Sequence, residues 1–334
     1  MAPTVLIVTE PTDVHSDAVV RELGRRDVPV FRLHTQDFPR DIAVSIEIDA
    51  DGVRGEIVTP HRSVRLGDIG CVWYRRPQAV TLDPSIAPEA VEFAQVQAEQ
   101  TIRTLCSVLD TPWVTCTPNQ LEIAEIKALQ LSRARAAGFA IPATLITNSP
   151  QRATGFRQSL AMTRCAVKPV AARMVKQQGS FLPPITQILP IDHPLESVAL
   201  APLIFEAYVE KSFELRCVVV GREVFPVKID SQRLENTRID WRAAWSNELT
   251  KDENRYEVYE LPEHVTRSIY RLMDSFGIRF ASMDLIVSPA GEVVFLDLNP
   301  NGQWLWLEKA LGLPIASSLA EMLIALSRPA AMSQ

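Results

Sequence analysis

The chain has 334 residues with 13 Gly and 24 Pro, and its 34 Lys and Arg against 40 Asp and Glu leave a net charge of −6. A hydrophobic fraction of 47% and a charged fraction of 22% exclude a disordered or collagen-like chain. The negative charge argues against a general nucleic-acid-binding protein, because such binding depends on neutralising phosphates. Neither GxGxxG nor GxxxxGK(S/T) occurs, which excludes these two glycine-rich phosphate loops.

The five cysteines indicate a reducing compartment. They are scattered, odd in number and without a CxxC pair, which favours reduced thiols over a disulfide framework or a zinc site. The apolar run at residues 5–8 is too short for a signal peptide. No apolar run approaches the roughly 18 residues that a membrane helix needs. We therefore expect a cytoplasmic protein without a membrane or nucleic-acid partner.

The first third of the chain predicts an α/β unit. The expected elements are strands at 5–8, 28–33, 42–48, 53–57 and 69–74, and helices at 17–26 and 88–109. The opening strand, helix and strand form a βαβ pattern, which is typical of a parallel sheet. Asp51-Gly52 between two apolar runs predicts a hairpin. The Pro- and Thr-rich stretch at 111–118 is the best linker, so we place the first domain at 1–118.

The rest of the chain predicts two further units, at 119–200 and 201–334. A helix at 121–137 stops at Gly138, which suits a helix C-terminus. The other expected strands are 144–146, 165–168, 203–209, 214–220, 223–229, 280–287 and 292–298, and the other helices are 262–276, 304–311 and 315–326. The predicted class is α/β, becoming α+β in the C-terminal part.

A hydrophobic hairpin at residues 280–302, FASMDLIVSPAGEVVFLDLNPNG, is the most informative segment. Its far half carries three polar side chains, Asp284, Asp297 and Asn299. A turn at 288–291 places Asp284 opposite Phe295, and by parity all three side chains then emerge from one face. Diagonal neighbours on such a face are roughly 7–8 Å apart, close enough for two carboxylates to share a cation. Oxygen ligands of this kind suit Mg²⁺ bridged to substrate phosphates.

The alternative is a pair of aspartates that merely sit at strand ends. The expected register pairs Val287 with Glu292. A shift by one residue would move Asp284 to the other face and weaken the metal hypothesis. The residues alone leave both interpretations open.

These residues resemble a known family. Asp284 followed by Asp297-Leu298-Asn299-Pro300-Asn301-Gly302 looks like the metal-binding end of ATP-grasp ligases, in which a D…(D/E)-x-N pattern holds Mg²⁺. The continuation QWLWLE at 303–308 is similar to the ATP-grasp macrocyclases that mature ribosomal peptides, the microviridin-type or graspetide enzymes. The segments VLIVTEP at 5–11, VWYRRP at 72–77 and GFAIPATLITNSP at 138–150 resemble the same subfamily. The resemblance implies an ATP-grasp fold with an N-terminal pre-ATP-grasp domain.

The resemblance also implies ATP-binding residues. Lys127 and Lys168 match the two phosphate-binding lysines, and Glu214 matches the acid that accepts the ribose hydroxyls. The stretch Glu206, Tyr208 and Val209 looks like the hinge whose backbone reads adenine, in an apolar slot that includes Leu298. Solvated lysines and an ordinary buried strand are the alternatives for these positions. Glycine is scarce after Lys168, which departs from the glycine-rich lid of many family members.

The family pattern assigns two residues to catalysis. Arg216 would hold the transferred phosphoryl group or the substrate carboxylate, which a bidentate guanidinium suits. Lys228 would hold the γ-phosphate, on the face opposite Phe225 and Val227. Solvated charges are the alternative for both. No residue stands out as a general base.

The expected activity is ATP-dependent macrocyclisation of a ribosomally made precursor peptide. An Asp or Glu side chain would be phosphorylated, and a Ser or Thr hydroxyl or a Lys amine would close an ester or amide ring. The candidate leader surface is residues 173–188, and Asp240-Trp241-Arg242 resembles a subfamily motif that would contact the core peptide. The family implies ATP, Mg²⁺ and a homodimer. Two alternatives stay open: a RimK-like ligase that adds amino acids to a carboxylate, and a non-catalytic nucleotide-binding regulator.

Overall fold

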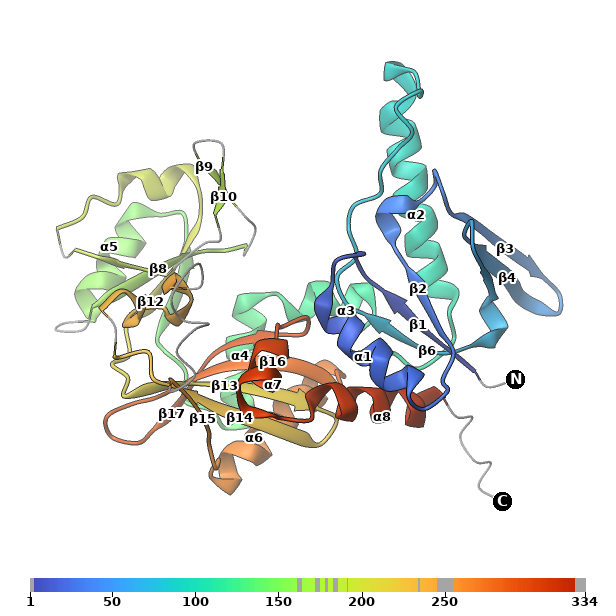
Figure 1. Cartoon of the computed structure of the whole chain (residues 1–334). Coiled ribbons are helices and arrows are strands. Elements are labelled where there is room, and N and C mark those ends of the chain that lie inside the picture. The colour runs from blue at the N-terminus through green and yellow to red at the C-terminus, as the bar shows by residue number, and fades with distance from the viewer. Residues whose placement is uncertain are drawn as a thin grey trace.

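The computed structural model describes residues 3–160, 164–171, 175–177, 180–182, 186–190, 192–233, 235–244 and 255–327. Figure 1 shows the arrangement of its elements. The N-terminal domain and the central subdomain, which contains β8, β12 and α5, rise at the two sides of a C-terminal sheet, with helices α3 and α4 between them.

The N-terminal domain is a parallel α/β unit with a hairpin appended. Its elements are β1 (Thr4–Val8), α1 (Val14–Gly24), β2 (Val30–Leu33), β3 (Ala43–Asp49), β4 (Gly52–Val58), β5 (Ser63–Arg65), β6 (Ile69–Tyr74) and α2 (Val91–Val108). β1 pairs in parallel with both β2 and β6, which confirms the predicted βαβ opening. β3, β4 and β5 form a separate antiparallel sheet. The Asp13 carboxylate starts α1 by accepting a hydrogen bond from the amide of His15.

The helix predicted at 121–137 is in fact two helices, so this prediction was wrong. α3 (Pro118–Ala124) begins at Thr117, which forms a capping box with Gln120, and α4 (Lys127–Ala137) begins two residues after α3 ends. The Gln130 amide donates to the carbonyl of Ala124 and so satisfies the end of α3. Because no Gly or Pro marks the break, the apolar spacing alone could not show it. The break places Lys127 in the first turn of α4.

The central subdomain is built on an antiparallel sheet with the order β11-β8-β12-β7. Its elements are β7 (Thr144–Thr147), α5 (Pro150–Ser159), β8 (Cys165–Pro169), β9 (Val175–Gln177), β10 (Ser180–Leu182), β11 (Gln187–Leu189) and β12 (Leu203–Ala207). β9 and β10 form a two-stranded hairpin of their own. Much of the predicted leader surface at 173–188 lies outside the described residues.

The C-terminal subdomain is a five-stranded antiparallel sheet with the order β15-β14-β13-β16-β17. Its elements are β13 (Phe213–Val220), β14 (Glu223–Ile229), β15 (Tyr256–Val258), α6 (Glu263–Phe276), β16 (Phe280–Val287), β17 (Val293–Asn299), α7 (Leu305–Leu311) and α8 (Ile315–Ser327). Residues that alternate along β13 face different cores. Leu215, Cys217 and Val219 pack with α4 and α6, whereas Val218 and Val220 pack with α1, α7 and α8.

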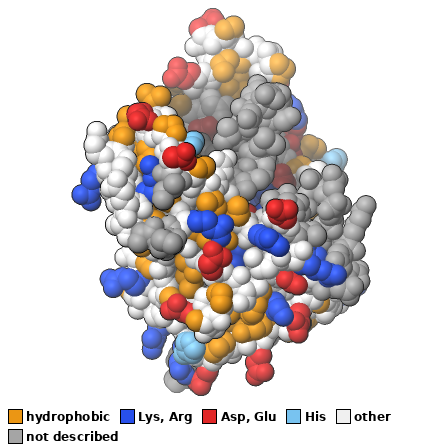
Figure 2. Space-filling view, turned by 90° about the vertical axis from the view of Figure 1, so that its left-hand side faces the viewer, with side chains coloured by type: hydrophobic (Ala, Val, Ile, Leu, Met, Phe, Trp, Pro, Cys, Tyr) orange, Lys and Arg blue, Asp and Glu red, His pale blue; other side chains and the backbone are white. Residues whose placement is uncertain are grey.

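These hydrophobic cores contain residues from more than one of the predicted domains. α4 packs on α6 and β17, and α8 packs on α1, β1 and β6 of the N-terminal domain. The C-terminal sheet therefore serves as the common base of the molecule. Within the described part of the chain, none of the helices combines the length and the apolar composition that crossing a bilayer requires. On the face in Figure 2, acidic, basic and hydrophobic side chains are interspersed over the described surface.

Candidate active site

The β16–β17 hairpin places Asp284, Asp297 and Asn299 on one face, as predicted, although by a different register. Val287 pairs with Val293 rather than with Glu292. A β-bulge between Asp284 and Leu285 then moves the pairing by one more residue, so that Asp284 lies opposite Asp297 and Ser282 opposite Asn299. Together the two shifts move the pairing by two residues, so the three side chains stay on one face of the hairpin. They bring the two carboxylates directly across from each other instead of diagonally.

The bulge also decides which leucine faces the cleft. Leu296 is the extra residue, and both Leu296 and Asp297 line a cavity of about 350 Å³. Leu298, which the sequence assigned to the adenine slot, is 1% exposed and packs in the core beneath α4 and α6. The assignment of Leu298 was therefore wrong. Leu296 takes its place because the bulge turns two successive residues to one side.

Each acidic side chain on this face has a cationic partner. Lys127 Nζ lies 2.9 Å from a carboxylate oxygen of Asp297, and Arg216 Nη1 donates to Asp284 at 2.7 Å. Burial opposes ionisation of Asp297, but the charge and hydrogen bond of Lys127 outweigh it and hold the pKa of this carboxyl below its ordinary value. Asp297 therefore presents an ionised carboxylate on the side of the hairpin that faces the cavity.

The predicted nucleotide-binding residues lie along two adjoining cavities. Lys168 and Glu214 line the cavity of about 350 Å³ together with the metal-binding candidates. Glu206, Tyr208 and Val209 line a smaller cavity of about 50 Å³. Four residues line both cavities and so connect them: Lys168, Thr186, Ile239 and Leu296.

Two buried ion pairs organise these cavities. Lys168 Nζ donates to Glu206 at 2.5 Å, and Lys211 Nζ donates to Glu214 at 2.7 Å. Burial raises the pKa of the Glu214 carboxyl, and Lys211 counteracts this effect. Lys211 was missed in the sequence because nothing in its neighbourhood marks it as buried, yet its side chain is only 4% exposed.

Lys228 is not brought to this face, which corrects its assignment to the γ-phosphate. It lies beside Leu215 on the other side of the sheet, pairs with Glu257 at 3.0 Å and stacks over the ring of Phe213. The apolar alternation of β14 correctly predicted that Lys228 and Val227 point to opposite faces of the sheet. Val227 lies beside Arg216, so it is Val227 and not Lys228 that shares the face of Arg216. Lys228 therefore faces away from the metal-binding candidates.

Arg242, and not Lys228, brings a positive charge to the cavity that Asp284 and Asp297 line. The segment Asp240-Trp241-Arg242, which the sequence connected with peptide binding, lines the same cavity as Asp284 and Asp297. Arg242 donates to Asp240 through Nε at 2.9 Å and Nη2 at 2.7 Å, a bidentate pair that raises the pKa of the guanidinium. Half of the Arg242 side chain is exposed. It is thus held in place by Asp240 while open toward the cavity.

Two buried arginines hold the loop that follows β17. Arg75 Nη1 donates to the carbonyl oxygens of Asn301 at 2.7 Å and Gly302 at 3.1 Å. Arg216 Nη2 donates to the carbonyl oxygen of Gln303 at 3.1 Å. Arg75 follows β6 of the N-terminal domain, whereas Arg216 lies on β13. The loop after Asn299 is therefore held from both domains at once.

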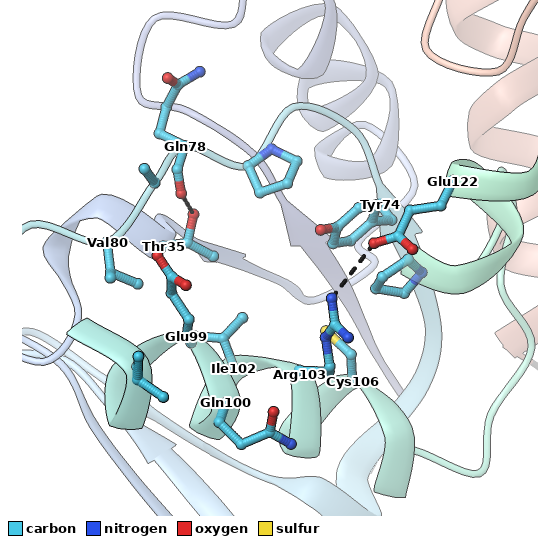
Figure 3. Close-up of a pocket in the computed structure, with 14 residues that line it drawn as sticks. Thr35, Tyr74, Gln78, Val80, Glu99, Gln100, Ile102, Arg103, Cys106 and Glu122 are labelled. Carbon is cyan, nitrogen blue, oxygen red and sulfur yellow. Dashed lines mark hydrogen bonds and ion pairs between the residues drawn. The ribbon is translucent and has the colours of Figure 1, made fainter. Parts of the chain in front are cut away.

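A further cavity of about 430 Å³ lies beside α2, and α3 also lines it (Figure 3). Arg103 and Glu122 point toward each other across it with 3.4 Å between their charged atoms, and Thr35 donates to the carbonyl of Gln78. None of the residues predicted to bind nucleotide or metal lines this cavity.

The comparisons with known proteins agree with this geometry. Residues 4–136 match the family model of the MvdD pre-ATP grasp domain. The structure is similar to a Chryseobacterium gregarium RiPP-associated ATP-grasp ligase in complex with ADP and a leader and core peptide. The similarity covers 98% of each chain, with a TM-score of 0.90 and 26% identity. The chain therefore has the fold of an ATP-grasp ligase.

Further solved structures resemble the ligase over most of its length. The macrocyclase MdnC of Microcystis aeruginosa, bound to its precursor peptide MdnA, has a TM-score of 0.83 and 26% identity over 96% of this chain and 99% of that chain. The ATP-grasp ligase PsnB, complexed with minimal precursor, Mg and ADP, has a TM-score of 0.73 and 21% identity over 97% of both chains, which supports the fold. The comparison with curated proteins gave no match.

The residues on the hairpin fit the magnesium that the ATP-grasp fold implies. Two carboxylates and an amide oxygen on one face are hard oxygen donors, which Mg²⁺ prefers together with substrate phosphates. Across the described residues, His, Cys, Asp and Glu side chains form no cluster of three or more that would hold a metal by themselves. A site that depends on a bound nucleotide to complete its ligands agrees with both observations.

Proposed function

We propose that the ligase is a peptide macrocyclase. In this proposal it phosphorylates an Asp or Glu side chain of a ribosomally made precursor peptide and joins it to a Ser or Thr hydroxyl or a Lys amine. The observation that carries the proposal is the continuous path from the slot at Glu206 and Val209 to the carboxylates of Asp284 and Asp297. The similarity to two peptide-bound ATP-grasp enzymes along nearly the whole chain supports the peptide as substrate.

ATP would lie along this path. The backbone of Glu206 and Val209, with Tyr208 beside them, would bind adenine in the small cavity next to Leu296. Glu214 would accept the ribose hydroxyls.

Lys127 and Lys168 would bind the α- and β-phosphates. Both are already held by carboxylates, Asp297 and Glu206, so that each ammonium is oriented before the nucleotide binds. Such preorganisation lowers the free-energy cost of ordering side chains on binding.

Asp284, Asp297 and Asn299 would hold Mg²⁺ at the far end of the path. When bound, the metal would offset the negative charge that develops on the transferred phosphoryl group. Arg216 holds Asp284 in position through its 2.7 Å hydrogen bond. Arg242, half exposed beside these carboxylates, is the residue that we now propose for the γ-phosphate.

The reaction would proceed in two balanced steps. A peptide carboxylate oxygen attacks the γ-phosphorus of ATP, and the bond between this phosphorus and the β,γ-bridging oxygen breaks. ADP departs, and the peptide side chain is now an acyl phosphate. The hydroxyl or amine of the same peptide then attacks the carbonyl carbon. Inorganic phosphate leaves, and the proton of the nucleophile passes to phosphate or solvent. Positioning and charge neutralisation account for this chemistry without a covalent enzyme intermediate.

We also propose a cytoplasmic homodimer. Five buried cysteines with free thiols suit a reducing compartment. Val91, Phe93 and Val96 on the N-terminal half of α2 are exposed apolar side chains, which suits a partner surface. Light scattering of the purified protein measures the oligomeric state, and a monomer at all concentrations would contradict the dimer.

Mass spectrometry of the product tests the proposed activity. The purified ligase is incubated with ATP, Mg²⁺ and the peptide encoded by a short neighbouring reading frame rich in Thr, Ser, Asp and Glu. We expect ADP release and a peptide that has lost the mass of one water molecule for each ring. A mass increase would instead identify the RimK-like addition of amino acids. Absence of both ADP release and a mass change would favour the non-catalytic regulator.

A further inference from the structure

Arg75 of the N-terminal domain is a fully buried cation. Its side chain is 0% exposed, and its Nε lies 3.4 Å from a carboxylate oxygen of Asp13, which is buried as well. Burying a guanidinium costs free energy that only hydrogen bonds and an opposite charge can offset. Arg75 lines neither of the two cavities that we assign to the nucleotide. Nucleotide binding therefore does not account for this residue.

The hydrogen bonds of Arg75 lead to Asn299 through the loop after β17, residues 300–304. Arg75 Nη1 donates to the carbonyl oxygens of Asn301 at 2.7 Å and Gly302 at 3.1 Å. The amide of Asn301 donates to Oδ1 of Asn299 at 2.9 Å, and the amide of Gly302 donates to the main-chain oxygen of Asn299 at 3.1 Å. The two residues that Arg75 holds thus bind both the side chain and the main chain of Asn299.

The hydrogen bond from Asn301 orients the side-chain amide of Asn299. A donor at 2.9 Å requires the oxygen, and not the nitrogen, of this amide on its side. A carbonyl oxygen has two lone pairs, so one remains for a cation. Because Asn299 is exposed at the end of β17, packing alone leaves its rotamer free, and the hydrogen bond is what holds it.

The loop after β17 has no room to move toward the sheet. A Cβ atom at Gly302 would lie 2.4 Å from the Cβ of Ser282 and 2.9 Å from Nη2 of Arg216. Only a residue without a side chain fits this close approach to β16 and β13. The loop therefore lies between the C-terminal sheet on one side and Arg75 on the other.

We propose that Arg75, supported by Asp13, is a positioning residue for the metal ligand Asn299. It acts through the main chain of Asn301 and Gly302, and its guanidinium contacts neither the metal nor the nucleotide. A complete Mg²⁺ site then depends on the N-terminal domain being docked on the C-terminal sheet. This inference rests on the metal-binding part of the proposed function.

Metal binding without turnover tests the role of Arg75. Mn²⁺, which takes the same oxygen ligands as Mg²⁺, is titrated into the whole protein with AMPPNP, and free Mn²⁺ is measured by electron paramagnetic resonance. We expect Arg75→Met to weaken Mn²⁺ binding about tenfold or more, the scale of losing a group that orients a metal ligand. The affinity for ADP in the presence of EDTA should stay unchanged. An unchanged Mn²⁺ affinity in a folded Arg75→Met protein would overturn the proposal.

Arg133→Met is the matched control. Arg133 also joins two segments through a carbonyl, because Nη1 donates from α4 to the oxygen of Ser275 at the end of α6 at 2.5 Å. It lines none of the cavities described above. We expect its Mn²⁺ affinity to equal that of the wild type. An equal loss in both variants would reduce Arg75 to a general structural contact and contradict its positioning role.

A double variant keeps the test valid if the single one misfolds. Arg75→Met leaves the carboxylate of Asp13 buried without a cation, which is destabilising. Combining it with Asp13→Asn removes both charges, and the new amide oxygen can still accept from the amide of His15. The double variant should unfold cooperatively and show the same loss of Mn²⁺ affinity. Normal Mn²⁺ binding in the folded double variant would contradict the proposal.

Asn299→Ala separates this inference from the proposed function. It should weaken Mn²⁺ binding, and adding Arg75→Met should weaken it no further, because Arg75 acts through Asn299. Weaker binding in Asn299→Ala alone, with normal binding in Arg75→Met, keeps the metal site and contradicts the role of Arg75. Unchanged binding in Asn299→Ala contradicts the metal assignment itself. Weaker binding in both variants, without any ring product from the wild type, keeps the role of Arg75 and contradicts the macrocyclase.

Discussion

At the scale of single residues, Asp297 joins the elements of the site. It lies across from Asp284 on the neighbouring strand, pairs with Lys127 from α4, and lines both the cavity of about 350 Å³ and a neighbouring cleft of about 770 Å³. Its side chain is 42% exposed, so it contributes little to the core. Lys127 holds this exposed carboxylate at 2.9 Å. Asp297 is therefore positioned to bind a ligand in the cleft and not to stabilise the core.

We predict that Asp297→Ala and Asn299→Ala abolish turnover and leave the fold intact. Each substitution removes an oxygen ligand, and we expect kcat to fall by about 100-fold or more, the scale of losing a group that stabilises developing charge. Thermal unfolding should change little because both side chains lie at the surface of the cleft. Asp274→Ala on α6 is the control, since this aspartate is 60% exposed and pairs with Arg222. Full activity in either site variant would refute the metal assignment.

At the scale of elements, one bulge in β17 has two effects. It restores the parity that the longer turn had reversed, and it directs both Leu296 and Asp297 into the cleft. Hydrophobic alternation predicted both strands of the hairpin and the common face of the three oxygen ligands. It could not predict the bulge, because the inserted Leu296 is as apolar as Phe295 before it. For that reason the sequence indicated the wrong leucine for the adenine slot.

The contact between α1 and the loop after β17 makes the fold sensitive to pH. His15 Nδ1 accepts a hydrogen bond from the amide of Leu305 at 3.3 Å, and its ring packs edge-on against Trp304. Burial lowers the pKa of His15 from 6.5 to about 3, and the charges of Arg75, Arg76 and Arg216 act in the same direction, whereas Asp13 opposes them. The neutral ring is thus the form that the folded state requires.

We predict that the free energy of unfolding falls as the pH drops from 6.5 toward 3. In this window the unfolded chain binds a proton on His15 that the folded chain does not, so protonation favours unfolding. His15→Gln keeps a hydrogen-bond acceptor without titrating, and its stability should fall less steeply between about pH 6.5 and 5. Denaturant unfolding at several pH values measures this slope. His61→Gln, an exposed histidine, is the control, and identical slopes in His15→Gln and the wild type would contradict the account.

At the scale of the whole molecule, the sequence predicted the order of the units and most of the elements. The βαβ opening, the strands β7, β8 and β12 and the acidic hairpin lie close to their expected places. β12, however, joins the central sheet and not the C-terminal unit to which the sequence assigned it, and the short strands β9, β10 and β11 were not predicted. Local patterns carry this information, because each strand and helix reflects its own apolar period. The break between α3 and α4 was not visible because it depends on Gln130 reaching the carbonyl of Ala124.

The positions of the cations could not be predicted either. Lys228 and Arg242 lie on segments whose faces are decided by pairing between strands distant in sequence and by the fold of the loop after β14. The grip of Arg75 on Asn301 and Gly302 joins residues more than 200 positions apart. No local pattern in the sequence indicates such contacts. They nevertheless connect the N-terminal domain to the candidate active site, because Arg75 supports the loop after β17.

Isotope transfer tests the central claim, phosphorylation of a peptide carboxylate, most directly. The Asp and Glu side chains of the precursor are labelled with the heavy oxygen isotope, and the phosphate released with ATP and Mg²⁺ is analysed by mass spectrometry. We predict one labelled oxygen in the phosphate for each ring, because the attacking carboxylate oxygen stays with phosphorus when the acyl phosphate is cleaved. Unlabelled phosphate released together with a ring product would contradict the acyl-phosphate route.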